Sequence, residues 1–253
     1  MTLTHFPRVV IVTGASRGIG AAVARLAGMR GAAVAVNYAR EADEARHVVA
    51  AIEASGGKAI AVQGDVSREE DVRRLFETAQ DQLGPLEGLV NNAGIVGGMA
   101  KVIDLEAAML DRVLAVNVTG SFLCAREALR RMATSRGGSG GAIVNLSSIA
   151  ARLGGAKEWV HYAASKGAID SFTLGLAREA AEEGVRVNAV APGLTETDMG
   201  VRDAPAGRTE RVMPTIPLAR LGQPEEIAEA VIWLLSPAAS YVTGAIMEVS
   251  GGR

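Results

Sequence analysis

The chain has 253 residues, a formal net charge of −2 and a single cysteine, and its acidic and basic residues are mixed along the whole length. These totals leave no basic stripe for binding nucleic acid and no pair of cysteines for an internal disulfide. The sequence shows no histidine and cysteine spacing typical of a zinc site, no apolar leader, and no apolar run of the length that spans a bilayer. We therefore expect a cytoplasmic protein without a metal, a membrane or a nucleic-acid partner.

Short apolar runs rich in β-branched residues alternate with segments of helical spacing. The runs predict seven strands near 8–13, 32–38, 58–63, 86–92, 141–147, 185–192 and 246–250. The segments between them predict helices near 18–30, 41–55, 68–83, 105–134, 160–182 and 223–235. Nearly continuous apolar strands between helices are typical of a parallel sheet covered on both faces. The sequence thus predicts a single α/β domain over 1–253, with a Rossmann-like, doubly wound sheet of seven parallel strands.

One connection is much longer than the others. Residues 194–222 are rich in charge, glycine and proline. Long irregular segments in compact domains are commonly lids over a site. We expect a substrate lid near 194–222, and an ordinary exposed loop is the alternative.

The first predicted strand runs directly into a glycine-rich turn, TGASRGIG at 13–20, and a predicted helix follows it. Gly14, Gly18 and Gly20 would let the backbone approach a pyrophosphate, whose charge then lies at the helix N-terminus. A tight turn that needs glycine for its own geometry is the alternative. Strand, loop and helix come in the order of a dinucleotide site, which favours cofactor binding.

The spacing TGxxxGxG resembles that of the short-chain dehydrogenase/reductase family, and other motifs of this family follow in order. They are GDV at 64–66, NNAG at 91–94, Asn117 in AVNVTG, NLSS at 145–148, YAASK at 162–166, PGLTET at 192–197 and YVTGAIMEVSGG at 241–252. The resemblance covers nearly the whole chain. It implies a seven-stranded doubly wound fold, a nicotinamide cofactor, hydride transfer between an alcohol and a carbonyl, and a homotetramer.

The resemblance also implies which residues hold the cofactor. They are Gly14, Ser16, Arg17, Gly18, Ile19, Gly20, Asn37, Tyr38, Arg40, Asp65, Val66, Asn92, Ala93, Gly94, Tyr162, Lys166, Pro192, Gly193, Thr195 and Thr197.

The end of the second predicted strand bears on the choice between NAD and NADP. A carboxylate there would bind the ribose 2′-hydroxyl of NAD, but this strand ends at Asn37 and Tyr38. Arg17 and Arg40 lie nearby, and a guanidinium is well suited to grip a 2′-phosphate. We therefore expect NADP, with NAD possible; two solvated arginines are the alternative.

Tyr162 and Lys166 share one face of a predicted helix. An ammonium ~4 Å from the phenolate would lower the tyrosine pKa by roughly three units from its ordinary value near ~10. The resemblance implies that Tyr162 exchanges the proton and that Lys166 also holds the nicotinamide ribose. It further implies that Ser148, the second serine of NLSS, holds the reacting oxygen and that Asn117 supports a water in a proton relay.

These motifs predict an oxidoreductase that acts on the CH–OH group of a small secondary alcohol, or on the matching ketone, and prefers NADP(H). Within the family, a 3-oxoacyl-carrier-protein reductase and a glucose-type sugar 1-dehydrogenase are alternatives. From another class, a nucleotide-binding regulator without turnover is the alternative. In the carrier-protein reductases a basic residue usually stands at the position of Glu183, so the acid there favours a small free substrate, unless it is only a solvated helix-end residue.

Overall fold

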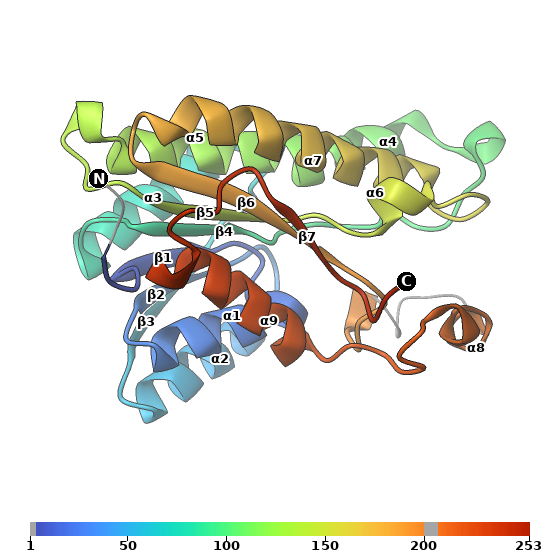
Figure 1. The fold of residues 1–253 in the computed structure, drawn as a ribbon, viewed down its shortest axis with the longest axis horizontal. Helices are drawn as coiled ribbons and strands as arrows, with labels where there is room; N and C mark the ends of the chain where they lie inside the picture. The colour runs from blue at the N-terminus through green and yellow to red at the C-terminus, as the bar shows by residue number, and fades with distance from the viewer. Residues whose placement is uncertain (1–3, 200–206) are drawn as a thin grey trace.

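The computed structural model describes residues 4–199 and 207–253. These residues form one parallel sheet of seven strands in the order β3-β2-β1-β4-β5-β6-β7 (Figure 1). The strands are β1 (Val9–Val12), β2 (Ala33–Tyr38), β3 (Lys58–Gln63), β4 (Gly88–Asn91), β5 (Gly141–Leu146), β6 (Val185–Pro192) and β7 (Ile246–Val249). The predicted fold class is therefore confirmed.

The helices cover both faces of this sheet. They are α1 (Gly18–Met29), α2 (Ala42–Ala54), α3 (Glu69–Leu83), α4 (Ala107–Leu114), α5 (Gly120–Met132), α6 (Ala150–Leu153), α7 (Val160–Ala181), α8 (Arg208–Val212) and α9 (Pro224–Leu235). In Figure 1, α1, α2 and α9 lie on one side of the sheet, and α4, α5 and α7 lie on the other. Each side has its own apolar core.

The central strands are buried on both faces of the sheet, and this explains why their sequences are continuous apolar runs. Every residue of β1, β4, β5 and β6 is buried, because helices cover the sheet from both sides. The chain winds outward from β1 to β3 and then returns to place β4 beside β1. In doubly wound sheets a ligand crevice opens at such a reversal, at the carboxyl ends of the strands.

The predicted helix at 105–134 is one continuous helical run that contains a wider turn. A five-residue π-helical segment, Ala115–Thr119, joins α4 to α5. By length and composition alone, the run Ala107–Met132 could cross a membrane, which the sequence analysis did not anticipate. Here Cys124, Ala125 and Ala128 of this run are buried in the core under the sheet, as in the core helix of a folded domain.

At the amino ends of the strands, a buried carboxylate fastens the start of the chain. Glu87 accepts hydrogen bonds from the Arg8 backbone N at 2.7 Å, from Arg8 Nε at 2.9 Å and from His5 Nε2 at 3.2 Å. Burial by itself would raise the pKa of Glu87, but the hydrogen bonds from Arg8 outweigh it and lower the pKa.

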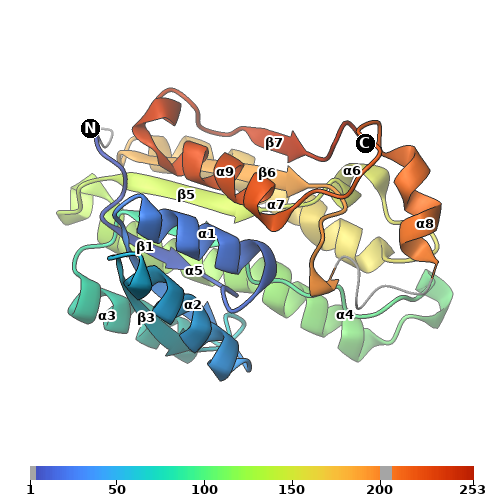
Figure 2. The same cartoon turned by 90° about the horizontal axis from the view of Figure 1, so that it is seen from below.

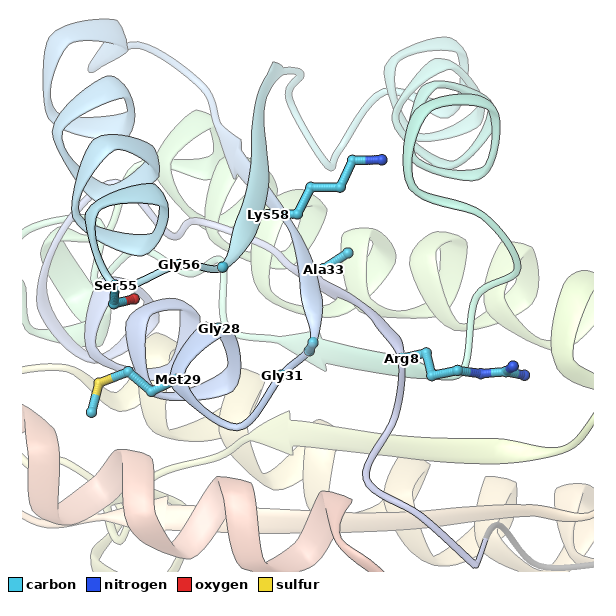
Figure 3. Close-up of a pocket in the computed structure, with 10 residues that line it drawn as sticks. Arg8, Gly28, Met29, Gly31, Ala33, Ser55, Gly56 and Lys58 are labelled. Atoms are coloured by element: carbon cyan, nitrogen blue, oxygen red, sulfur yellow. The ribbon is translucent and has the colours of Figure 1, made fainter.

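A hollow of about 420 Å³ lies at the same amino edge (Figure 3). Figure 3 shows the side chains of Arg8 and Lys58, which line it, directed away from Ser55 and Met29. Arg8 is bound to Glu87, and Lys58 Nζ donates to the Gln82 carbonyl at 2.6 Å. The hollow therefore brings no reactive groups together.

Candidate active site

The carboxyl ends of the strands border a cavity of about 1360 Å³. Pockets for one drug-sized ligand measure roughly 300–1,000 Å³, so this cavity has room for a dinucleotide and a small substrate together. Most of the site residues expected from the sequence line it: Gly14, Ser16, Arg17, Gly18, Ile19, Asn37, Arg40, Asp65, Val66, Asn92, Ala93, Gly94, Ser148, Tyr162, Lys166, Pro192, Gly193, Thr195 and Thr197. Gly20, Tyr38 and Asn117 lie outside this lining.

The glycine loop forms one end of the cavity and fits a pyrophosphate. Gly14 has a left-handed backbone with φ +60°, and a Cβ there would lie 2.8 Å from the Ala93 Cα atom. Asn92 Nδ2 donates to the carbonyls of Thr13 and Gly14 at 2.8 and 2.9 Å, which ties the loop to the end of β4. Helix α1 has no side-chain cap and no acid in its first turn, so its N-terminal amides remain suited to an anion.

The two side chains at the end of β2, Asn37 and Tyr38, have different roles, which the sequence did not reveal. Asn37 is buried; its Oδ1 accepts from the Gly14 backbone N at 3.2 Å, and its Nδ2 donates to the carbonyls of Val62 and Gly64 at 3.3 and 3.0 Å. Its amide therefore joins the glycine loop to the end of β3. The next side chain, Tyr38, packs against the core on the α1 side of the sheet.

Two arginines line the cavity near this edge. Arg17 Nη1 donates to Asp198 Oδ2 at 3.0 Å. For Arg40 we find no side-chain partner within 4–199 and 207–253. Asp65, expected to help hold the cofactor, accepts from the Ser67 backbone N at 3.0 Å and from Arg112 Nη2 at 2.8 Å. Arg112 also lines the cavity and was missed in the sequence analysis.

Tyr162 and Ser148 meet where β5 ends and α7 begins. Both side chains line the cavity, and Ser148 Oγ accepts from the Ala150 backbone N at 3.1 Å. Burial raises the pKa of Tyr162, and the nearby Ser148 hydroxyl and the charge of Arg208 offset part of this rise. The pair thus places two hydroxyl groups side by side in the cavity wall.

Lys166 follows one turn later, and its environment corrects one expectation. Its Nζ lies 5.7 Å from the centre of the Tyr162 ring and donates to the Leu146 carbonyl at 2.6 Å. Burial lowers the pKa of Lys166 to about 8, against a smaller opposing effect of Asp170. The Tyr162 pKa is raised and not lowered as expected, because burial of the phenol is the largest effect and Lys166 is not among the groups that oppose it.

Asn117 lies in the π-helical segment, behind the cavity wall. Its Oδ1 accepts from the Ile95 backbone N at 2.8 Å, and its Nδ2 donates to the Ile95 carbonyl and to Ser165 Oγ, each at 2.9 Å. A Cβ on Gly94 would lie 3.4 Å from Asn117 Oδ1 and 3.6 Å from Lys166 Nζ. Asn117 therefore joins the segment after β4 to α7, close to the lysine.

His161 immediately precedes Tyr162 in α7. It is buried, and its Nε2 lies 2.9 Å from the Val96 carbonyl oxygen. This contact holds the segment after β4 against α7.

The sequence analysis missed several charged residues of the cavity region. Asp170 accepts a hydrogen bond from Ser147 Oγ, and burial raises its pKa. Glu158 accepts from Arg208 Nε at 3.0 Å and from Arg211 Nη2 at 2.6 Å. Nothing in the sequence singles these residues out, since the contacts join positions 23 to 53 residues apart.

The expected lid contains a helix that the sequence analysis did not predict. Helix α8 and the following turn, Met213–Thr215, lie within 194–222. Leu194, Val212 and Ile216 form a small apolar cluster that holds this segment to the end of β6. Residues 200–206 of the expected lid lie outside the described residues.

A parallel sheet with a glycine loop at one end of its cavity and the Tyr162 and Lys166 pair in its wall defines a nicotinamide-dependent oxidoreductase. Residues 14–253 match the family model described as enoyl-(acyl carrier protein) reductase. The chain belongs to the short-chain dehydrogenase/reductase family, whose members act on alcohol and ketone groups with NAD or NADP.

Curated relatives match over nearly their full length. The chain is 50% identical to the uncharacterized oxidoreductase YgfF of Escherichia coli K12, over 97% of this chain and 99% of the relative. It is 39% identical to glucose 1-dehydrogenase 2 of Bacillus subtilis, over 97% and 94%. It is 40% identical to the 3-oxoacyl-[acyl-carrier-protein] reductase of a Synechocystis strain, over 97% and 96%. Identity therefore does not choose between the two alternative activities.

Solved structures are similarly close. A 7α-hydroxysteroid dehydrogenase complexed with NADH and 7-oxo glycochenodeoxycholic acid has a TM-score of 0.91 and 36% identity, covering 97% of this chain and 93% of that one. A short-chain dehydrogenase from Burkholderia cenocepacia in complex with NADP has a TM-score of 0.89 and 35% identity, covering 96% of each chain. Both forms of the cofactor thus occur among these neighbours.

Proposed function

We propose that this protein is an NADP(H)-preferring oxidoreductase that interconverts a small ketone and its secondary alcohol, with Tyr162 as general acid and base. The observation that carries the proposal is that Tyr162 and Ser148 lie together in the wall of a cavity that continues to the glycine loop. Lys166 lies on the same helix as Tyr162 and also lines that cavity.

The chemistry follows from these positions. The bound nicotinamide supplies or accepts the hydride. Ser148 and Tyr162 donate hydrogen bonds to the carbonyl oxygen and stabilise the negative charge that develops there. As the carbon is reduced, the Tyr162 hydroxyl gives its proton to that oxygen, and in the oxidative direction the phenolate takes it back.

The residues around the tyrosine assist this proton transfer. The nearby Ser148 hydroxyl and the positive charge of Arg208 both act to lower the pKa of Tyr162 and so favour the phenolate. Lys166 and Asn117 flank Gly94, and we assign them to holding the nicotinamide ribose and a relay water.

The preference for NADP rests on the residues at the end of β2. No acid stands at Asn37 or Tyr38, and the Asn37 side chain is fully used by the glycine loop and β3. Arg17 and Arg40 line the cavity at this edge, and a guanidinium can bind a 2′-phosphate through two parallel hydrogen bonds.

Glu183 favours a small free substrate over an acyl group on a carrier protein. Its carboxylate accepts from the Ser135 backbone N at 2.9 Å and from Ser135 Oγ at 2.7 Å, so it fastens the turn at Thr134–Arg136. It is therefore more than a solvated helix-end residue, and it places an acid where a basic contact to an acidic carrier protein is expected. Sugar-like alcohols are small free substrates and so remain within this proposal. The presence of Ser148, Tyr162 and Lys166 together in the cavity argues against a nucleotide-binding regulator without turnover.

We also propose a homotetramer, located in the cytoplasm. The outer face of α5 and α7 is apolar: the Phe122 and Phe172 rings lie 3.9 Å apart between centres, and Phe122 and Leu174 are 49% and 43% exposed. Such a face is suited to burial against a second copy. Sedimentation velocity at dilute concentration should show a tetramer, and a stable, fully active monomer would contradict the assembly.

The central test replaces the proposed proton donor. Tyr162→Phe should bind NADPH like the wild type and lose about 10³-fold in turnover over a panel of ketones and sugar-like alcohols, because it deletes the hydroxyl and little volume. Tyr241→Phe is the matched control, since Tyr241 is fully exposed and does not line the cavity. Turnover of Tyr162→Phe close to that of the control would refute the mechanism.

A further inference from the structure

An excess of positive charge gathers at the end of the cavity near Tyr162. Arg208 and Arg211 of α8 and Arg253 after β7 all line the cavity, and Glu158, which also lines it, is paired with two of them. Both Glu158 oxygens are taken, by Arg208 Nε at 3.0 Å and by Arg211 Nη2 at 2.6 Å. Glu158 balances one of these three guanidinium charges, so the four side chains together carry an excess of positive charge.

Arg208 is fixed in place and still has donors to offer. Its side chain is only 11% exposed, and its guanidinium carbon lies 4.1 Å from the centre of the Trp159 ring. The bond to Glu158 uses Nε alone, and within the described ranges no acceptor meets its two Nη groups. Stacking and the Nε bond together hold the fork of Nη donors in one orientation, which suits bidentate binding of an anion.

Arg253 is anchored by its backbone rather than by its side chain. Its carbonyl oxygen accepts from Arg152 Nη2 at 3.0 Å, and Arg152 is paired with Glu248 at 2.9 Å. Its guanidinium has no hydrogen-bond partner in the part of the chain that the structure describes. Burial and the charge of Arg208 lower the pKa of Arg253, and the charge of Glu158 offsets only part of this effect.

This positive corner lies next to the reacting group. Arg208 is near enough for its charge to act on Tyr162. Figure 2 shows α8 beside α6 and the end of the chain, on the side of the molecule away from α2 and α3. A molecule with its carbonyl at Tyr162 and Ser148 would therefore meet the arginines with another part of its structure.

We propose that the substrate is an anionic carbonyl compound or alcohol whose carboxylate or phosphate group is bound by Arg208 and Arg253. This inference rests on the proposed reaction at Tyr162 and names the class of its substrate. Glu158 holds Arg208 and Arg211 in position and leaves the remaining charge for the ligand. A partly buried, unpaired guanidinium is unfavourable, so an anion gains charge-assisted hydrogen bonds and relieves that cost together.

The test measures binding and does not need turnover. Titration calorimetry on enzyme saturated with NADP⁺ would compare cyclohexanecarboxylate, its neutral amide cyclohexanecarboxamide, and the phosphate monoester cyclohexyl phosphate. We expect at least one of the two anions to bind about tenfold or more tightly than the amide, the size of one charge-assisted hydrogen bond. Tighter binding of the carboxylate or of the phosphate tells which group the site takes, and either result supports the inference.

The variants locate the anion. Arg253→Met and Arg208→Met should each reduce anion affinity about tenfold without changing that for the amide. If Arg208→Met does not fold, Arg253→Met alone still tests whether the arginines bind the anion. Arg73→Met is the matched control, because Arg73 lies on the outer face of α3 and does not line the cavity. Equal binding of anions and amide, or anion binding that neither variant weakens, would overturn the inference.

A kinetic comparison separates this inference from the proposed function. The ketone 4-oxopentanoate and its methyl ester differ in the charge and not in the reacting carbonyl. If the ester and the acid are reduced with equal kcat/KM while Tyr162→Phe is inactive, the proposed oxidoreductase function is supported and the proposal of an anionic substrate is wrong. If anions bind at the arginines while Tyr162→Phe keeps full turnover, the site stands and the proposed function is wrong.

Discussion

The two ends of the cavity are formed by different kinds of chemical groups. At the cofactor end, glycines and backbone groups form the surface, and the amides of Asn37 and Asn92 fasten the loop to β3 and β4. At the substrate end, the surface is formed by charged side chains such as Glu158 and Arg208 that come from separate loops and a short helix. The first end is specified by close backbone approach and the second by long-range pairing of side chains.

This difference shows how such a fold can change its substrate and keep its cofactor. A side chain at Gly14 or Gly20 would meet backbone or a hydrogen-bonded amide closer than van der Waals distance, and these groups cannot easily move aside. A substitution among the arginines changes charge on side chains that reach the cavity from the surface. The three predictions below test this contrast.

The largest expected effect is at Gly20. A Cβ there would lie 2.4 Å from Asn92 Nδ2 and 2.6 Å from the Gly14 carbonyl, so Gly20→Ala should displace the loop and weaken NADP(H) binding about 100-fold. Cofactor titration by fluorescence would measure this loss. Gly175→Ala is the control, because a Cβ at Gly175 would meet nothing within 4 Å and alanine favours the helix. If the Gly20→Ala protein binds NADPH normally, close backbone approach does not specify the cofactor end of the cavity.

A smaller and selective effect is expected at Arg17. Arg17→Ala should reduce affinity for NADP about tenfold and leave that for NAD nearly unchanged, because it removes charge-assisted bonds to the 2′-phosphate alone. Arg25→Ala, on the exposed side of α1 and opposite Glu225 at 3.8 Å, serves as control. Equal losses for both cofactors would show that Arg17 does not bind the 2′-phosphate.

The smallest effect is a pH dependence due to Lys166. Its pKa is lowered to about 8, so it carries its charge below that pH and loses it above. The KM for NADPH should therefore rise several-fold between about pH 7 and pH 9, since the ammonium donors to the ribose hydroxyls are lost. Lys166→Met should show a high KM that does not change over this range. A wild-type KM that is flat across it would remove Lys166 from cofactor binding.

The sequence was sufficient for the fold because the apolar runs coincide with the buried strands. The prediction for β6 has the same ends as the strand, and those for β1 and β4 are too long by one or two residues at their ends. Burial continues past the ladder at Thr13, Leu86 and Glu87, which extends the apolar pattern there. The π-helical turn at Ala115–Thr119 was missed, since its widening depends on hydrogen bonding and leaves little trace in the apolar spacing.

Only part of the candidate site could be predicted from the sequence. Glycine positions and the Tyr162 and Lys166 spacing are local patterns, so their place in the cavity could be expected. The inward turn of the Asn37 amide and the pairing of Glu158 with Arg208 depend on contacts across 23 to 50 residues of chain, which local spacing does not encode.

The π-helical segment gives a criterion for comparing relatives. A π turn arises when one extra residue is accommodated in an α-helix, so that the helix on either side keeps its place. Losing one residue from 115–119 would restore regular α-helical winding there and leave α4 and α5 packed as before. Asn117 would then leave Ile95 and Ser165 while the sheet and its cores remained in place. A one-residue gap at this point in an aligned homologue would thus mark a protein that keeps this architecture and has lost the asparagine from its catalytic neighbourhood.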